Sequence, residues 1–175
     1  MQTLLPFIKA RRFTVISAIM LIALTLSACG FQLRGAADLS FKNLYMQGSK
    51  LSISKDLTRL LQTNGVQVVD KAEDAELLIE LLSESNQKRI QSLSGGGLVR
   101  EFELIYLLNF RIREASSPTW GPVQTIRGRR DFSYSDSALL GKAEEEARLN
   151  SDMRNDATRE LLRRLTAYKP ATAQK

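Results

Sequence analysis

The segment from Leu98 to Arg113 carries the clearest strand pattern in this chain of 175 residues. Apolar side chains occupy its even positions except at Arg100: Leu98, Phe102, Leu104, Tyr106, Leu108, Phe110 and Ile112. The polar side chains of Glu101, Glu103, Asn109, Arg111 and Arg113 stand on the odd side. Because successive side chains of a strand point to opposite faces, this pattern predicts a long strand with one buried face and one wet face. The buried face needs a second layer to cover it.

Turn residues bound this strand on both sides. The run Gly95-Gly96-Gly97 before it predicts a hairpin tip, and a Ser-Ser-Pro sequence within residues 115–119 predicts a tight turn into a second long strand, from Trp120 to Tyr134. Shorter strands are predicted at residues 41–47 and 66–69. The stretch from Leu77 to Ser83 alternates like a strand, but its leucine-rich composition also fits a helix; the β-like context favours the strand.

Two amphipathic helices complete the pattern. One is predicted from an N-cap at Ser54 to the Asn64-Gly65 stop, and the other from about Asp136 to Tyr168. The second helix has an apolar stripe with a spacing of four residues, formed by Leu149, Met153, Ala157, Leu161 and Leu165. The order of elements predicts an α/β (α+β) two-layer sandwich, in which a mixed four- to five-stranded sheet carries two helices on one face.

Cys29, the only cysteine of the chain, follows a segment with the layout of a secretory signal. Three cations precede an apolar run from Phe13 to Leu26, which is shorter than a membrane-spanning helix requires. The sequence Leu26-Ser27-Ala28-Cys29 resembles the lipobox of bacterial lipoproteins. That resemblance implies cleavage before Cys29, lipid on its sulfur and its new amino group, and anchoring at a membrane. Gly30 follows where Asp would signal inner-membrane retention, which favours the periplasmic leaflet of the outer membrane.

These signals divide the chain into four parts. We expect a signal peptide at 1–28, a lipidated tether at 29–40, a single α/β domain at 41–168 and a flexible tail at 169–175. The chain has 25 Lys and Arg against 19 Asp and Glu, a net charge of +6, and loss of residues 1–28 removes three cations and no acid, which leaves +3. The mature protein is therefore only mildly basic.

The residue types argue against an enzyme. The chain contains no histidine, and its one cysteine is expected to be acylated, so a Ser-His or Cys-His nucleophile pair is unattainable. The run Glu144-Glu145-Glu146 is interpreted as a solvated first turn of the last helix, because consecutive helical residues do not share a face. The glycine run lacks the Lys-Ser/Thr of a phosphate-binding loop. No metal or cofactor is expected apart from the covalent lipid on Cys29.

Cations gather around the predicted glycine tip. Lys88 and Arg89 precede it and Arg100 follows it, while the exposed side of the predicted hairpin adds Arg111, Arg113, Arg127 and Arg129. Such side chains bind phosphate groups, and an abundant phosphorylated amphiphile that an outer-membrane protein meets is lipopolysaccharide (LPS). Nucleic acid is a poor alternative outside the cytoplasm. A turn near Ser117 would also place Glu103 close to Arg129 and Asp131, so cross-strand ion pairs are expected to use part of this charge.

The mature chain as a whole resembles the LptE family of LPS-assembly lipoproteins. The resemblance rests on Cys29 to Gly35 (Cys-Gly-Phe-Gln-Leu-Arg-Gly), on Leu60 to Val66, on Arg100-Glu101-Phe102 and on the helix that begins around Ala138 to Lys142 and runs to Leu165. It implies a protein that is no enzyme, binds LPS through basic residues at one end of the fold, plugs the lumen of the LptD β-barrel and assists its assembly.

On matching positions, the resemblance implies that Lys142 binds LPS, with Lys88, Arg89 and Arg100 as further candidates. The tip sequence Ser94-Gly95-Gly96-Gly97 departs from the family, whose members often carry a basic or aromatic residue there. Two alternatives remain open. One is an auxiliary lipoprotein of an ABC-type lipid transporter, and the other is a periplasmic hydrolase that uses carboxylates.

Overall fold

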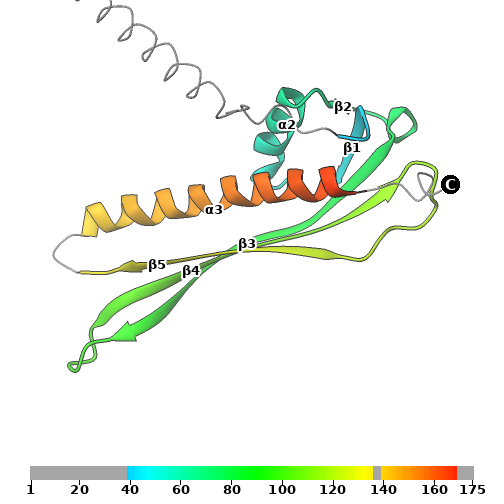
Figure 1. Cartoon of the computed structure of the whole chain (residues 1–175). Coiled ribbons are helices and arrows are strands. Elements are labelled where there is room, and N and C mark those ends of the chain that lie inside the picture. Colours follow the sequence, from blue (N-terminus) through cyan, green and yellow to red (C-terminus); the bar gives the residue numbers. More distant parts are fainter. Residues whose placement is uncertain (1–38, 136–138, 169–175) are drawn as a thin grey trace, which may run out of the picture. The chain divides into compact units, whose positions relative to one another are not determined.

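The computed structural model describes residues 39–135 and 139–168, all within the compact unit formed by residues 36–175 (Figure 1). The expectations for the signal peptide, Cys29 and the tail concern residues outside the described ranges. In chain order the elements are β1 (Asn43–Gly48), α2 (Ile53–Thr63), β2 (Gln67–Val69), a 3-10 turn η1 (Ala72–Asp74), β3 (Leu77–Leu93), β4 (Val99–Glu114), β5 (Gln124–Ser133) and α3 (Leu139–Ala167).

The strands form one mixed sheet in the order β2-β1-β3-β4-β5. β1 runs parallel to β2 and to β3, whereas β4 runs antiparallel to both of its neighbours, β3 and β5. The expected mixed sheet of four to five strands is therefore confirmed with five, including the short strand at 67–69 and the strand interpretation of Leu77 to Ser83. Both β2 and β5 are edge strands.

Both helices cover one face of the sheet, as predicted (Figure 1). The stripe of α3 is buried at Met153, Ala157, Leu161 and Leu165, and it packs against the even-numbered apolar side chains of β4. The approach is close at Gly128 of β5, where a Cβ atom would lie 3.3 Å from the Cβ and Cγ of Met153. Within the described ranges, the buried core residues lie between Phe41 and Leu165.

The third strand is ten residues longer than expected. The predicted end at Ser83 is wrong, because β3 continues to Leu93 through a polar run that pairs with β4, for example Ser85 with Leu107 and Gln87 with Ile105. Polar strand residues give no apolar period, so only the pairing with β4 shows that they form a strand.

The face opposite the helices is not uniformly wet. Leu78 and Ile105 lie on this open face, yet each is only 1% exposed. In the sheet register Leu78 stands between Tyr45 and Arg113, and Ile105 stands between Gln87 and Arg129. Long side chains cover apolar neighbours with their stems while their polar ends stay in water. The prediction of a wet odd face on β4 is therefore wrong at Ile105.

The β3–β4 hairpin extends beyond the rest of the fold. α3 has 29 residues and spans about 43 Å at the helical rise, whereas β3 has 17 residues and spans about 55 Å. β5 ends at Ser133, opposite Glu101, so the last part of the hairpin is a two-stranded ribbon (Figure 1). We call this end of the sheet, with the β3–β4 turn, the end of β5 and the start of α3, the distal end.

Candidate functional site

The turn at the distal end is fixed by hydrogen bonds. The Ser94 amide donates to the Leu98 carbonyl at 2.7 Å, the Leu98 amide donates to Ser94 Oγ at 3.0 Å, and the Gly97 amide donates to the Ser94 carbonyl at 2.9 Å. Gly97 has a φ of 79°, in the left-handed region where glycine meets no steric penalty. The glycine run therefore forms the expected hairpin tip, with one defined turn.

Lys88 is ion-paired to α3 at this end, and its side chain is 37% exposed. Its Nζ lies 2.6 Å from Glu146 Oε2 of α3 and 4.2 Å from the centre of the Phe102 ring. The rings of Phe132 and Tyr134 lie 5.6 and 6.0 Å from the same nitrogen. A cation above aromatic faces and next to a carboxylate is stabilised by both. Lys88 thus ties the hairpin to α3.

Lys142 also has partners within the protein. Its Nζ lies 2.7 Å from Glu145 Oε2 and donates to Ser133 Oγ at 3.1 Å, and its side chain is 19% exposed. The interpretation of Glu144 to Glu146 as a solvated first turn is wrong, because the helix begins at Leu139 and two of these carboxylates hold lysines. In residues 39–135 and 139–168, no group of three His, Cys, Asp or Glu side chains could hold a metal ion.

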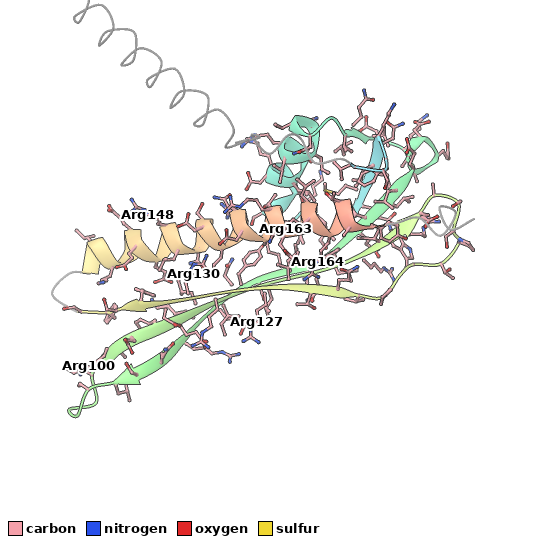
Figure 2. The ribbon with its side chains drawn as sticks, in the orientation of Figure 1. Arg100, Arg127, Arg130, Arg148, Arg163 and Arg164 are labelled. Atoms are coloured by element: carbon pink, nitrogen blue, oxygen red, sulfur yellow. The ribbon has the colours of Figure 1, made fainter. Side chains whose placement is uncertain are left out.

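Arg89 and Arg100 are exposed cations of the distal end that have no ion pair within the described ranges. Arg89 donates to Gln87 Oε1 at 2.9 Å and lies on the open face, opposite Glu103 in the register. The Arg100 side chain has no hydrogen bond or ion pair with any residue in the described ranges. It borders a cavity of about 330 Å³ that Ser92, Glu101, Ser133 and Tyr134 also line. Figure 2 shows Arg100 near the hairpin tip.

The structure thus brings all four predicted LPS-binding residues to the distal end, but the four side chains differ in whether they have an ion-pair partner. Lys88 and Lys142 are ion-paired, while Arg89 and Arg100 are exposed and have no ion pair within the described ranges. Adjacent strand residues point to opposite faces, so Arg89 and Lys88 cannot face the same ligand from one side of the sheet. Of the four, Arg100 is the cation with no partner in the described part of the chain.

A second cationic region, which the sequence did not indicate, lies between β5 and α3. Arg127, Arg130, Arg163 and Arg164 (Figure 2), with Arg129, line a cavity of about 330 Å³. Two carboxylates are each shared by two arginines: Arg130 and Arg159 each lie 2.5 Å from Asp156, and Arg163 and Arg164 lie 2.5 and 2.9 Å from Glu160. Arg159 and then Arg130 lower the pKa of Asp156, and Arg164 and then Arg163 lower the pKa of Glu160.

The cross-strand pair predicted for the hairpin is present, since Arg129 Nε lies 2.8 Å from Glu103 Oε1. Arg111 pairs with Glu80 and stacks on Trp120, at 4.9 Å from the ring centre. Arg127, in contrast, has no hydrogen bond or ion pair within residues 39–135 and 139–168. The open face therefore presents fewer free cations than its arginine count indicates.

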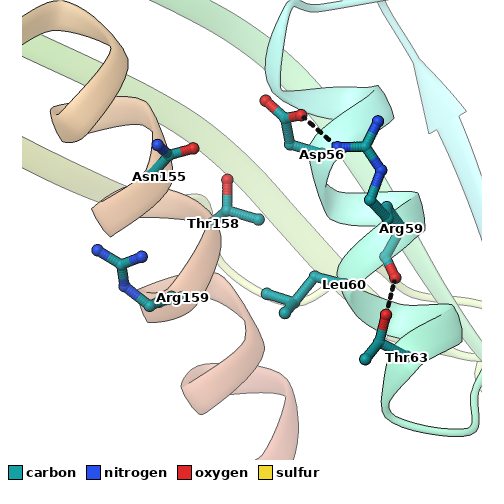
Figure 3. A pocket seen from close by; sticks show the side chains of 7 residues that line it. All are labelled: Asp56, Arg59, Leu60, Thr63, Asn155, Thr158 and Arg159. Atoms are coloured by element: carbon teal, nitrogen blue, oxygen red, sulfur yellow. Dashed lines mark hydrogen bonds and ion pairs between the residues drawn. The ribbon is translucent and has the colours of Figure 1, made fainter. Parts of the chain in front are cut away.

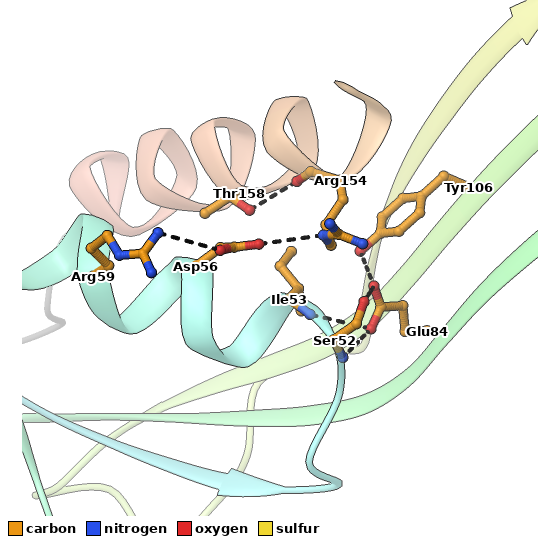
Figure 4. A network of polar contacts seen from close by, with 8 residues as sticks. All are labelled: Ser52, Ile53, Asp56, Arg59, Glu84, Tyr106, Arg154 and Thr158. Carbon is orange, nitrogen blue, oxygen red and sulfur yellow. Dashed lines mark hydrogen bonds and ion pairs between the residues drawn. The ribbon is translucent and has the colours of Figure 1, made fainter. Parts of the chain in front are cut away.

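A polar network joins α2 to the sheet (Figure 4). Glu84 of β3 accepts hydrogen bonds from the Ser52 amide at 2.7 Å, the Ile53 amide at 3.3 Å, Ser52 Oγ at 2.6 Å and Tyr106 Oη at 2.8 Å. Burial raises the pKa of Tyr106, and the bond to Glu84 acts in the same direction. The expected N-cap at Ser54 is wrong, because α2 begins at Ile53 and a carboxylate from a distant strand satisfies its first amides.

The groove between α2 and α3 is polar. Asp56 links Arg154 at 3.3 Å and Arg59 at 3.8 Å. Figure 3 shows a neighbouring pocket of about 210 Å³, lined by Asp56, Arg59, Leu60, Thr63, Asn155, Thr158 and Arg159. The charged side chains that line this pocket are ion-paired or exposed to solvent. Among its lining residues there is no nucleophile with an adjacent base.

The fold and the distal end together define a class: a small α+β binding domain whose distinctive chemistry is a cationic end with a projecting hairpin. The family model of LptE, described as lipopolysaccharide-assembly, matches residues 39–165. This chain therefore belongs to the LptE family, which confirms the resemblance noted in the sequence. Membership does not favour the alternative of an ABC-type transporter lipoprotein.

Known relatives agree with this assignment. The chain is 27% identical over 161 residues to the LPS-assembly lipoprotein LptE of Photorhabdus laumondii subsp. laumondii, a match that covers 89% of this chain and 86% of the relative. The solution structure of lipoprotein B from Nitrosomonas europaea superimposes with a TM-score of 0.70 at 39% identity, over 79% of this chain and 91% of that one. Rare lipoprotein B from Shewanella oneidensis gives 0.65 at 26%, over 72% and 95%.

Replacing Glu84 tests its role as a cap from outside the helix. Glu84→Ala leaves two amides and the Tyr106 hydroxyl without their acceptor, and we expect it to lower the free energy of unfolding by about 2–4 kcal/mol. The control is Glu101→Ala, since Glu101 accepts only an exposed hydrogen bond from Ser92 and its loss should cost less than about 1 kcal/mol. Urea denaturation measures both. Equal costs for the two variants would contradict the capping role.

Proposed function

We propose that this chain is a lipid-anchored outer-membrane protein that binds LPS at its distal end and assists an LptD-type barrel in LPS assembly. The observation that carries the proposal is the gathering of Lys88, Arg89, Arg100 and Lys142 at one end of a domain of the LptE family. The named relative from Photorhabdus laumondii supports the LPS-assembly role.

The physical basis of binding is the attraction between these cations and the phosphates of the LPS head group. Arg100 needs no rearrangement to meet a phosphate, whereas Lys88 and Lys142 must exchange Glu146 and Glu145 for it. Binding of a phosphate by protein cations would compete with the divalent ions that bridge neighbouring LPS molecules. The protein would thereby loosen LPS packing without a chemical reaction.

The anchor in this proposal is the lipid on Cys29, held in the periplasmic leaflet of the outer membrane. Within residues 39–135 and 139–168, no helix is long and apolar enough to span a membrane. A cysteine that carries more than one lipid chain attaches a protein stably to a membrane. The solved relatives are themselves described as lipoproteins, which supports this mode of attachment.

Arg100 tests LPS binding with a matched control. Arg100→Gln removes the cation that has no internal partner, and we expect it to weaken LPS binding by residues 36–175 about tenfold, or about 1.4 kcal/mol. Arg127→Gln removes an equally unpartnered arginine from the middle of β5 and should change the affinity less than about twofold. Titration with detergent-dispersed LPS measures both. Equal affinities for Arg100→Gln and the unmodified protein would contradict a role for this residue.

The barrel partnership and the anchor can be tested in one preparation. Full-length protein, purified from its native membranes in mild detergent, is expected to bring a large barrel protein with it. Its intact mass should show a chain that begins at Cys29 and carries acyl groups. Isolation without a large partner would overturn the partnership, and an unmodified cysteine would overturn the anchor.

A further inference from the structure

The tip of the β3–β4 hairpin is apolar as well as cationic. Ile90, Leu93 and Leu98 have exposed fractions of 58%, 55% and 65%. In the described part of the chain, five large apolar side chains are exposed to this degree. The remaining two are Leu140, at the start of α3, and Val123. Four of the five therefore lie at the distal end. Exposed apolar side chains gathered in one place mark an interaction site.

The exposure of these residues follows from the architecture. Ile90 stands opposite Phe102, which stands opposite Phe132, so it continues the helix-facing apolar row of the sheet. Leu93 pairs with Val99 beyond the end of β5. No third strand and no helix within the described ranges covers this ribbon (Figure 1). The hydrogen-bonded turn at Ser94 keeps Leu93 and Leu98 at the end of the hairpin, and their side chains cannot fold back into the core.

Cations flank the apolar tip on both strands. Arg89 directly precedes Ile90, and Arg100 lies two residues after Leu98. Both are exposed, and the Arg100 side chain is without a partner in the described ranges. A ligand that matches this surface has phosphate groups at one level and hydrocarbon immediately beyond them. A phosphorylated, multiply acylated lipid has this layout, with its phosphates next to the roots of its acyl chains.

We propose that the hairpin tip binds the acyl chains of the phosphorylated lipid whose head group is held by the cations of the distal end. This inference rests on the proposed LPS-binding function and extends it from the head group to the hydrocarbon. Ile90, Leu93 and Leu98 lie among the chains, while Arg100 meets a phosphate at their base. Burial of apolar side chains in hydrocarbon supplies affinity that does not weaken with salt.

The test combines two ligands with two variants of residues 36–175, which form one compact unit. The ligands are detergent-dispersed LPS and the same LPS with its acyl chains removed and its phosphates kept. Leu93→Ser/Leu98→Ser removes apolar side chains from the tip. Val123→Ser removes an equally exposed apolar side chain, at 58%, from outside the distal end. All the substituted residues are exposed, and circular dichroism checks that each variant remains folded.

We expect the double variant to bind intact LPS about tenfold or more weakly than the unmodified domain, because two leucine side chains lose their contact with hydrocarbon. Val123→Ser should bind as the unmodified domain does. On deacylated LPS, the double variant and the unmodified domain should bind with equal, weaker affinity. This pattern assigns the lost affinity to the acyl chains.

The alternative outcomes separate the two proposals. One outcome is that the unmodified domain binds intact and deacylated LPS equally, and that the double variant has the same affinity for both ligands as the unmodified domain. The tip then does not bind acyl chains, although the proposal that the domain binds LPS stands. If the unmodified domain binds neither ligand, the proposed function itself fails. If the double variant keeps full LPS affinity but no longer captures the barrel partner from detergent extracts, the tip is a protein-docking site and the acyl-chain proposal is overturned.

Discussion

The structure depends on a difference in length between one long β-hairpin and the shorter helix that covers it. Strands rise more than twice as far per residue as helices, so the 29 residues of α3 cover less length than the 17 residues of β3. Burial of Met153, Ala157, Leu161 and Leu165 against the helix-facing side of β4 stabilises the covered part. The uncovered part becomes the ribbon of the distal end, where exposed leucines and arginines meet.

Several ion pairs of the domain join one element of the fold to another. Lys88 joins the hairpin to α3 through Glu146, Arg130 joins β5 to the same helix through Asp156, and Arg129 pairs with Glu103 across two strands. Exposed pairs of this kind contribute little stability each, but they remove cations from the set that can meet a ligand. The number of arginines is thus a poor guide to an anion-binding site. An arginine that has no partner within the protein is a better indication of such a site.

The sequence predicted the parts of the fold that bury an apolar face. The period of two in Leu98 to Arg113 and the spacing of four in Leu149 to Leu165 both report burial, and both elements lie where they were expected. The extension of β3 from Glu84 to Leu93 was missed because its residues are mostly polar and show no apolar period of two. The cap provided by Glu84 was missed for a different reason: it joins residues 32 positions apart through the tertiary fold.

The candidate site was only partly visible in the sequence. Composition and order located the cations around the glycine tip, and the resemblance pointed to Lys142. Which of these cations are ion-paired within the protein could not be predicted from the sequence. The contacts of Lys88 with Phe102 and Glu146, for example, depend on both the strand register and the position of α3. The exposure of Leu93 and Leu98 likewise depends on where β5 ends, which an apolar pattern alone does not specify.

The central claim is that LPS binds at the distal end of this sheet. Hydrogen–deuterium exchange of residues 36–175, with and without LPS, tests it most directly, because exchange reports protection segment by segment. The account predicts that LPS slows exchange around the β3–β4 turn, the end of β5 and the first turns of α3, and leaves α2 unchanged. Protection confined to the α2–α3 groove or to the middle of β5 would contradict it.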